Sequence, residues 1–425
     1  MVDLEYPPPD GGSRAWFVML GSFFVNGLIF GLMNCYSVIY ERLQEELMID
    51  NVPGASSKAA LVGSLSIGTT FFLSPIAGIL TDRIGVRLTT FIGGLFGASG
   101  LFLSSFVVHK VEGLYLTYGI LFGIGASLAY TPSLVILGHY FERYLGLVNG
   151  FVTAGSSVFT MIMPFFIYYL LTTFGLSNTL RCLSALLVCL IGIALLFKPT
   201  NQASVQKKQM KSLLNADIWK NKRYVVWATV IPLALFGYFV PYVHMVKFVS
   251  IKFPKHDGKI LVLCLGVTSG FGRLMFGRLA DNPRFNRILL QQVAFIIIGS
   301  FTMLIVITPT FFLLEGIALL MGIFDGCFIS LLGPIAFDLT GQSGAGQAIG
   351  FLLGFCSIPL TVGPPIAGWL YDEYGSYDLP FLLAGVPPIV GGLALSLIRC
   401  FPADEEKKNP EKEREVVTLT VDGDA

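Results

Sequence analysis

Long apolar segments alternate with short polar stretches along almost the whole chain. A helix needs about 20 mainly apolar residues to cross the hydrocarbon core of a bilayer, and twelve segments of this kind can be counted. They are 15–40, 59–80, 88–108, 114–137, 145–170, 179–197, 225–246, 259–279, 288–307, 310–337, 348–370 and 379–401. We therefore predict an all-α membrane protein with twelve transmembrane helices, and the even number places both termini on the same side of the membrane.

A polar stretch divides the twelve segments into two groups of six. It is the longest hydrophilic interruption inside the chain and is rich in Lys and Arg. Positively charged loops stay on the cytoplasmic side of a membrane, so we expect this loop and both termini to be cytoplasmic. The lysines of 247–259 oppose this orientation, because that loop is expected outside. The predicted parts are a tail (1–14), a six-helix bundle (15–197), the loop (198–224), a second six-helix bundle (225–401) and a second tail (402–425).

The composition supports a membrane protein and narrows its chemistry. Of the 425 residues, 54% are hydrophobic and only 13% are charged, against about 25% charged in a soluble domain. The net charge of +1 gives no basis for binding nucleic acid. The sequence has no His-rich metal cluster, no GxSxG turn and no GxxxxGK[ST] phosphate loop. We therefore expect neither an enzyme nor a metal, a cofactor or ATP-driven pumping.

Two charged residues interrupt segments that are otherwise apolar. Arg273 lies past the centre of 259–279, and Asp325 lies near the middle of 310–337. A charge at membrane depth costs about 3 kcal/mol even on the mildest scales, so it faces a partner or a watered cavity rather than lipid. We therefore predict a route for a small solute through the protein. The arginine fork suits a carboxylate, either that of Asp325 or that of a substrate which displaces Asp325. A static structural pair is the alternative.

A glycine-rich motif follows the second segment. Residues 78–87 read Gly-Ile-Leu-Thr-Asp-Arg-Ile-Gly-Val-Arg, and the two glycines allow close helix approach and a tight turn. The aspartate can accept hydrogen bonds from the N-terminus of a neighbouring helix. A partial echo of this motif, 277–281, ends the eighth segment. We predict a latch that holds one conformation, formed by Gly78, Asp82, Arg83, Gly85 and Arg87.

The latch motif resembles the GxLxDRxGxR signature of the major facilitator superfamily, which implies two pseudo-symmetric six-helix bundles. Residues 140–157 resemble the segment that opens span five in monocarboxylate transporters. Residues 10–16 resemble that family's entry to span one, although an aromatic residue is missing and the Trp stands one position late. The stretches 117–159, 237–244 and 384–389 look most like the branch that carries thyroid hormones and aromatic amino acids.

The resemblance implies secondary transport by alternating access, with the substrate bound near the middle of the membrane. Lactate carriers of the family place a Lys in span one and an Asp one turn before the span-eight Arg. Here span one has no Lys, and Ser269 stands at the second position. We therefore expect facilitated transport of aromatic amino acids or iodothyronines rather than proton symport. The residues expected to bind the substrate are Phe30, Met33, Asn34, Tyr130, His244, Arg273 and Asp325.

Two alternatives stay open. A proton-coupled symporter of short monocarboxylates such as lactate fits the same fold, because Asp325 and His244 can titrate. A non-transporting membrane receptor or sensor is the alternative of another class, and the short C-terminal tail disfavours it. The expected partners are a small carboxylate or amino-acid substrate and the lipid bilayer, with room for an ancillary subunit or a homodimer. The expected location is the plasma membrane.

Overall fold

The computed structural model describes residues 10–49, 55–198, 217–256 and 258–401, and these residues form helices without any strand. Residues 1–9 of the predicted N-terminal tail, the whole predicted C-terminal tail and most of the predicted central loop lie outside the described residues. The described chain begins at Asp10 and ends at Phe401.

The N-terminal part contains a series of helices up to Leu196. The elements are α1 (Ser13–Asn34), α2 (Tyr36–Ile49), α3 (Ala55–Phe72), α4 (Ser74–Ile84), α5 (Val86–Ser104), α6 (Val111–Leu114), the π-helical turn η1 (Tyr115–Leu121), α7 (Phe122–Tyr140) and α8 (Leu145–Leu196). The C-terminal part contains α10 (Asp217–Lys220), α11 (Lys222–Tyr238), α12 (Val240–Lys252), α13 (Lys259–Ala280), α14 (Arg287–Ile307), α15 (Phe311–Tyr374), α16 (Asp378–Ala394) and the 3-10 turn η2 (Leu395–Cys400).

The helices of the described residues account for the twelve predicted spans. Ten are long and apolar enough to cross a membrane, and α3 with α4 makes an eleventh, bent by 45°. Helix α8 counts once among the ten but has 52 residues, which is about 78 Å and more than twice the thickness of a bilayer core. It breaks at Gly175, whose φ of 73° is left-handed, so it supplies two spans. Helix α15 breaks in the same way at Gly341, and its two parts are already counted separately among the ten.

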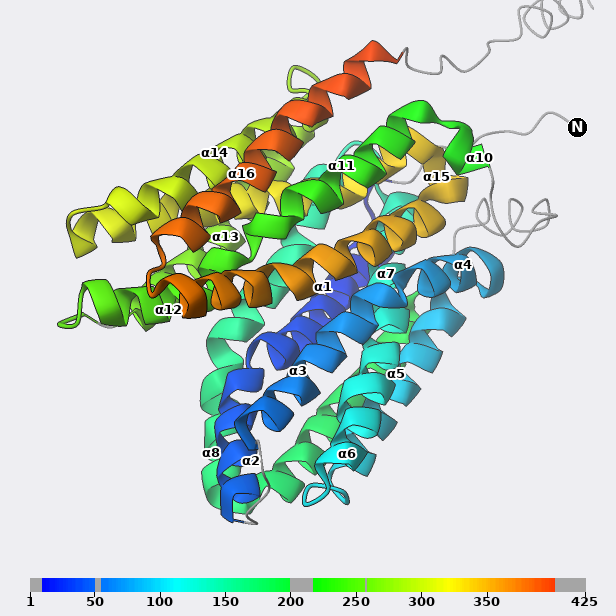
Figure 1. Ribbon diagram of the computed structural model, residues 1–425. Coiled ribbons are helices and arrows are strands. Elements are labelled where there is room, and N and C mark those ends of the chain that lie inside the picture. The colour runs from blue at the N-terminus through cyan, green and yellow to red at the C-terminus, as the bar shows by residue number, and fades with distance from the viewer. Residues whose placement is uncertain (1–9, 50–54, 199–216, 257, 402–425) are drawn as a thin grey trace, which may run out of the picture.

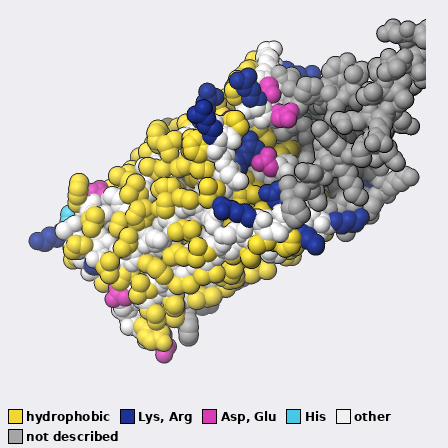
Figure 2. Space-filling model, turned by 90° about the horizontal axis from the view of Figure 1, so that it is seen from above, with side chains coloured by type: hydrophobic (Ala, Val, Ile, Leu, Met, Phe, Trp, Pro, Cys, Tyr) yellow, Lys and Arg dark blue, Asp and Glu magenta, His cyan; other side chains and the backbone are white. Residues whose placement is uncertain are grey.

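The outside of the molecule is apolar, as lipid contact requires. Phe165 on α8 is 78% exposed and Phe312 on α15 is 84% exposed, which would be costly in water. Figure 2 shows hydrophobic side chains covering most of one face, with the Lys and Arg side chains gathered mainly toward its ends. The exposed apolar surface therefore marks the part of the protein that lies in the bilayer.

The helices form two bundles that meet at one end and diverge toward the other (Figure 1). The end where they meet, here called the terminal face, holds the turn between α7 and α8 and the turn between α13 and α14. The opposite end is called the far face. The most extensive contacts between the bundles are α8 with α13 and α4 with α15, and α15 also packs against α3, α7 and α8. These two contacts, here called the α4–α15 seam and the α8–α13 seam, close the molecule at the terminal face.

Candidate functional site

The predicted charges in the membrane lie close together and are buried. Arg273 on α13 is 7% exposed and Asp325 on α15 is 3% exposed. Their closest ion-pair distance is 4.0 Å, from Nη2 to Oδ2, so the predicted pair is present but loose. Asp325 has two further partners, because it accepts hydrogen bonds from the Tyr238 hydroxyl and the Ser269 hydroxyl. The carboxylate is therefore well satisfied without Arg273.

Arg273 makes its closest contacts with the other half of the molecule. Its Nη1 donates to the carbonyl oxygen of Thr153 and to the hydroxyl of Ser156, both on α8. Its Nε has no hydrogen-bond partner within the described part of the chain. A buried guanidinium with an unused donor is costly. Arg273 is thus a cation placed between the two halves with capacity left for an anion.

Sequence reasoning did not single out Thr153 and Ser156. The signal was present as a hydroxyl-rich stretch, Thr-Ala-Gly-Ser-Ser at 153–157, on a helix with small residues every four positions. Helical hydroxyls mostly bond to carbonyls of their own helix, so their contact with Arg273 could not be expected from the sequence.

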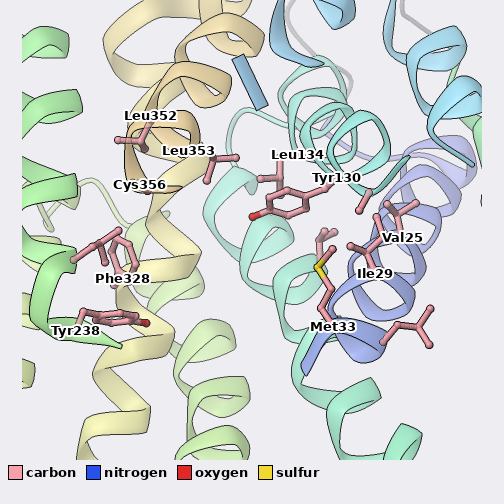
Figure 3. Close-up of a cluster of buried hydrophobic side chains, with 14 of the residues drawn as sticks. Val25, Ile29, Met33, Tyr130, Leu134, Tyr238, Phe328, Leu352, Leu353 and Cys356 are labelled. Carbon is pink, nitrogen blue, oxygen red and sulfur yellow. The ribbon is translucent and has the colours of Figure 1, made fainter. Parts of the chain in front are cut away.

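Aromatic and apolar side chains from both halves face one another, and some of them lie close to this cation. Figure 3 shows Val25, Ile29, Met33, Tyr130 and Leu134 facing a second group made of Tyr238, Phe328, Leu352, Leu353 and Cys356. The Tyr130 ring meets Phe30 edge to face at 4.9 Å, and its hydroxyl points toward the C-terminal half. Tyr130 and Tyr242 also lie within electrostatic range of Arg273. The arrangement can receive a ring on either side of a bound carboxylate.

Two of the predicted binding residues take other positions. Asn34 is exposed at the end of α1 and donates to the Thr160 hydroxyl on α8 at 3.1 Å. His244 lies on α12, six residues beyond Tyr238 toward the far face. Its Nδ1 is 3.4 Å from the Tyr377 hydroxyl, and the Tyr377 ring stacks on Tyr371 at 4.2 Å. His244 therefore belongs to an aromatic cluster nearer the far face, while Tyr130 lies within electrostatic range of Arg273 and Met33 lies near Tyr130 (Figure 3).

The predicted latch at Asp82 has the expected partner. Asp82 Oδ2 accepts a hydrogen bond of 3.1 Å from the backbone N–H of Gln347, in the first turns of the helix that follows the break at Gly341. A side chain at Gly78 would overlap the carbonyl oxygen of Gly346, and Gly85 has a φ of 92°. Of the two latch arginines, Arg83 is half-buried and Arg87 is exposed.

The echo motif forms a second contact of the same kind. Asp281 at the end of α13 accepts hydrogen bonds from the N–H groups of Gly146 (2.7 Å) and Leu147 (2.9 Å) at the start of α8. Arg287 lies 3.9 Å from the same carboxylate and 2.7 Å from Asp338. Burial raises the pKa of Asp281, while the two N–H groups and Arg287 act in the opposite direction. The charge of Asp281 is tolerated here because these groups stabilise it.

Glycines line both seams and let the backbones touch. In the α8–α13 seam, a methyl group on Gly146 would lie 2.5 Å from the Gly277 carbonyl oxygen, and one on Gly150 would overlap the Arg273 carbonyl. In the α4–α15 seam, a methyl group on Gly350 would overlap the Ser74 carbonyl. Such close approach is typical of helix pairs that pack through small residues in membranes.

Two bundles that meet along glycine-lined seams around a buried cation are the arrangement of a membrane carrier. Comparison agrees, since residues 15–316 and 266–422 match the Major Facilitator Superfamily. Two solved structures share the fold at low identity. The human organic anion transporter MFSD10 has a TM-score of 0.68 at 13% identity and covers 91% of this chain and 100% of its own. FucP in the outward conformation has a TM-score of 0.67 at 14% identity, covering 90% and 98%.

Similar sequences identify the family within this superfamily. Monocarboxylate transporter 10 of Rattus norvegicus is 47% identical over 93% of this chain and 80% of its own length. The Homo sapiens protein of the same name is 47% identical, covering 91% and 78%. Monocarboxylate transporter 12 of Xenopus laevis is 27% identical, covering 96% and 93%. The chain therefore belongs to the monocarboxylate transporter family of the Major Facilitator Superfamily. It is a multi-pass membrane transporter rather than an enzyme.

Proposed function

We propose that this protein transports aromatic amino acids or iodothyronines across the plasma membrane by facilitated diffusion. The observation that carries the proposal is Arg273, a buried cation with an unused Nε donor, set between aromatic side chains of both halves. The substrate carboxylate binds the guanidinium fork. Asp325 either competes with that carboxylate or meets the substrate amino group. The ring lies against Phe30, Met33 and Tyr130, and the relatives named Monocarboxylate transporter 10 support a carboxylate substrate.

The transport cycle proposed here is alternating access. Both seams are closed at the terminal face, and the bundles diverge toward the far face (Figure 1). We place the terminal face in the cytoplasm, since the Lys- and Arg-rich stretch 198–224 follows α8 and leads into α11, and α8 ends and α11 begins at that face. The described conformation is then outward-facing, as is the FucP structure of similar fold. Substrate enters from the far face, and rocking of the halves around Arg273 opens the seams.

The far-face residues add a second contact zone. We propose that His244 and its aromatic neighbours meet the distal ring of a larger substrate, and that Asn34 lies on the entry side. His244 is half-buried beside Tyr377, so it can donate or accept a hydrogen bond there.

Coupling to protons has little support in this arrangement. Asp325 already accepts from Tyr238 and Ser269. The position one turn before Arg273, an Asp in the lactate carriers, is Ser269 here, and a serine hydroxyl cannot carry the coupled proton. We therefore propose uniport.

Uptake by the purified, reconstituted protein tests the proposal. Radiolabelled tyrosine, tryptophan, an iodothyronine and lactate are compared in proteoliposomes with and without a proton gradient. We expect uptake of the aromatic substrates down their own gradients, with no acceleration by the proton gradient. Uptake of lactate alone, driven by the gradient, would overturn both the substrate and the uniport proposal.

A further inference from the structure

Asp10 lies before α1 and holds the turn between α7 and α8. Its Oδ1 accepts hydrogen bonds from the N–H groups of Glu142 (2.8 Å) and Arg143 (2.9 Å). Its own N–H donates to the carbonyl of Tyr140 at 3.0 Å. Asp10 has a φ of 47°, the one positive φ among the described residues other than glycine. That strained conformation is kept because three hydrogen bonds fix the segment.

The same turn supplies the amides that Asp281 binds. Residues 142–147 carry four N–H groups with carboxylate acceptors, two bound by Asp10 and two by Asp281. Asp10 belongs to the N-terminal half and contacts only that half in these bonds. Asp281 belongs to the C-terminal half. Asp10 therefore fixes the turn from within the N-terminal half, and Asp281 binds the same turn from the C-terminal half.

The two carboxylates have different roles in alternating access. The contact of Asp10 stays within one rigid half, so rocking leaves it intact. The contact of Asp281 crosses the α8–α13 seam, so it must break when the terminal face opens. Ordering a free turn costs conformational entropy. When the turn is ordered beforehand, docking of Asp281 avoids that cost.

We infer that Asp10 is a positioning residue for the transport cycle. It fixes the 142–147 turn so that the amides of Gly146 and Leu147 meet Asp281, and it thereby stabilises the conformation closed at the terminal face. The inference rests on the alternating access of the proposed function. Loss of Asp10 shifts the ratio of terminal-face-closed to terminal-face-open molecules toward the open form by about five- to thirtyfold, the cost of ordering about one residue.

A distance measurement between the halves tests this inference. Spin labels are introduced as non-canonical amino acids at Phe106 and Lys255, which are exposed at the far face on different halves, in full-length protein in nanodiscs. Asp10→Ala is expected to move the population from the long to the short distance. Asp10→Asn keeps an acceptor oxygen and is expected to move it less. Asp378→Ala removes an exposed aspartate at the start of α16 and serves as the matched control without a shift.

The Asp281→Asn background separates positioning from general damage. If Asp10 acts through Asp281, adding Asp10→Ala to Asp281→Asn changes the population by less than about twofold. Equal shifts in both backgrounds overturn the inference, and so does an unchanged distance distribution in Asp10→Ala. Deuterium exchange of the peptide containing 142–147 gives an independent readout and is expected to rise in Asp10→Ala.

The remaining outcomes keep this inference distinct from the proposed function. If Asp10→Ala does not fold, the smaller shift in Asp10→Asn decides the matter, and its absence overturns the inference. If the wild type transports none of the aromatic substrates but the distances shift as expected, the substrate proposal fails and the role of Asp10 stands. A wild type confined to one distance under all conditions overturns both alternating access and this role.

Discussion

The two seams that join the halves have the same ends and different middles. In the α4–α15 seam, Asp82 accepts from the start of one helix, and in the α8–α13 seam Asp281 does the same. Glycines line both seams and bring backbones into contact. Eight positions before each aspartate the seams differ, because Ser74 stands in one and Arg273 in the other.

The difference between Ser74 and Arg273 suits the two seams to different tasks, namely closing the terminal face and binding a substrate. Ser74 is fully buried and its hydroxyl donates to Thr70 of the neighbouring turn at 3.0 Å, so its polar group is satisfied locally. Arg273 reaches across the seam to α8 and also lies 4.0 Å from Asp325. We propose that the symmetric ends hold the molecule shut and that the asymmetric middle carries the charge that recognises a substrate. A substrate bound at Arg273 would then loosen one of the two seams.

Removal of Arg273 should have the largest effect. Arg273→Ala is expected to lower tyrosine uptake by at least about 30-fold, since losing one partner of a buried charge contact costs several kcal/mol. Ser74→Ala, at the matching place in the other seam, is expected to keep uptake within about twofold of the wild type. Initial uptake rates in proteoliposomes with equal protein content give both values.

The quantity of folded Arg273→Ala protein in the membrane is the control for that measurement. We expect it to stay close to the wild-type level. Wild-type uptake by Arg273→Ala would show that the substrate anchor lies elsewhere. A loss as large in Ser74→Ala would show that the two seams are equivalent.

Placing a large side chain at a glycine of either seam should have the next largest effect. The shift of the conformational population should be the same for both seams. Gly150→Leu places a side chain against the Arg273 carbonyl, and Gly350→Leu places one against the Ser74 carbonyl. The backbones must separate, so we expect the terminal-face-open form to gain about tenfold or more in each variant. The distance between the far-face labels measures this shift. Gly266→Leu on α13 is the control, because open space surrounds Gly266.

The sequence predicted the parts of this comparison that depend on charge and spacing. The depth of Arg273 and Asp325 in apolar segments pointed to a buried pair, and the motif at 78–87 pointed to a contact between Asp82 and the start of a neighbouring helix. Other parts depend on the direction in which each side chain points, which the spacing of residues along the chain does not specify. Met33 and Asn34 are neighbours in sequence, but consecutive residues point about 100° apart on a helix. Met33 therefore lies near Tyr130, while Asn34 turns toward α8.

The partners of Arg273 on α8 could not be predicted for a further reason. Thr153 and Ser156 lie about 120 positions away in the chain, and they meet Arg273 across the α8–α13 seam. The hydrophobic pattern does not specify which residues of two distant helices face each other. The twelve spans, by contrast, are needed in every conformation, and the pattern predicted them.

Replacing Asp82 and replacing Asp281 should shift the conformational population by moderately different amounts. Asp281 uses both carboxylate oxygens to accept from backbone N–H groups, whereas Asp82 accepts the backbone N–H of Gln347 with Oδ2 alone. Asparagine offers one acceptor oxygen, so it replaces Asp82 better than Asp281. We expect Asp281→Asn to shift the population toward the terminal-face-open form by about tenfold and Asp82→Asn by about threefold. The label distances report both shifts, and the reverse order would contradict the comparison.

The smallest predicted effect concerns Ser156, whose hydroxyl occupies a donor of Arg273 that a substrate carboxylate could use. Ser156→Ala removes the hydroxyl that Nη1 donates to, while the Thr153 carbonyl stays. A guanidinium with one partner fewer is a better site for a carboxylate, so KM for tyrosine should fall by about two- to fivefold with Vmax little changed. Ser157→Ala, next to it against Gly270, should leave KM unaltered. A higher KM in Ser156→Ala would mean that this hydroxyl contacts the substrate itself, and the α8–α13 seam would then bind the substrate from both sides rather than release Arg273 to it.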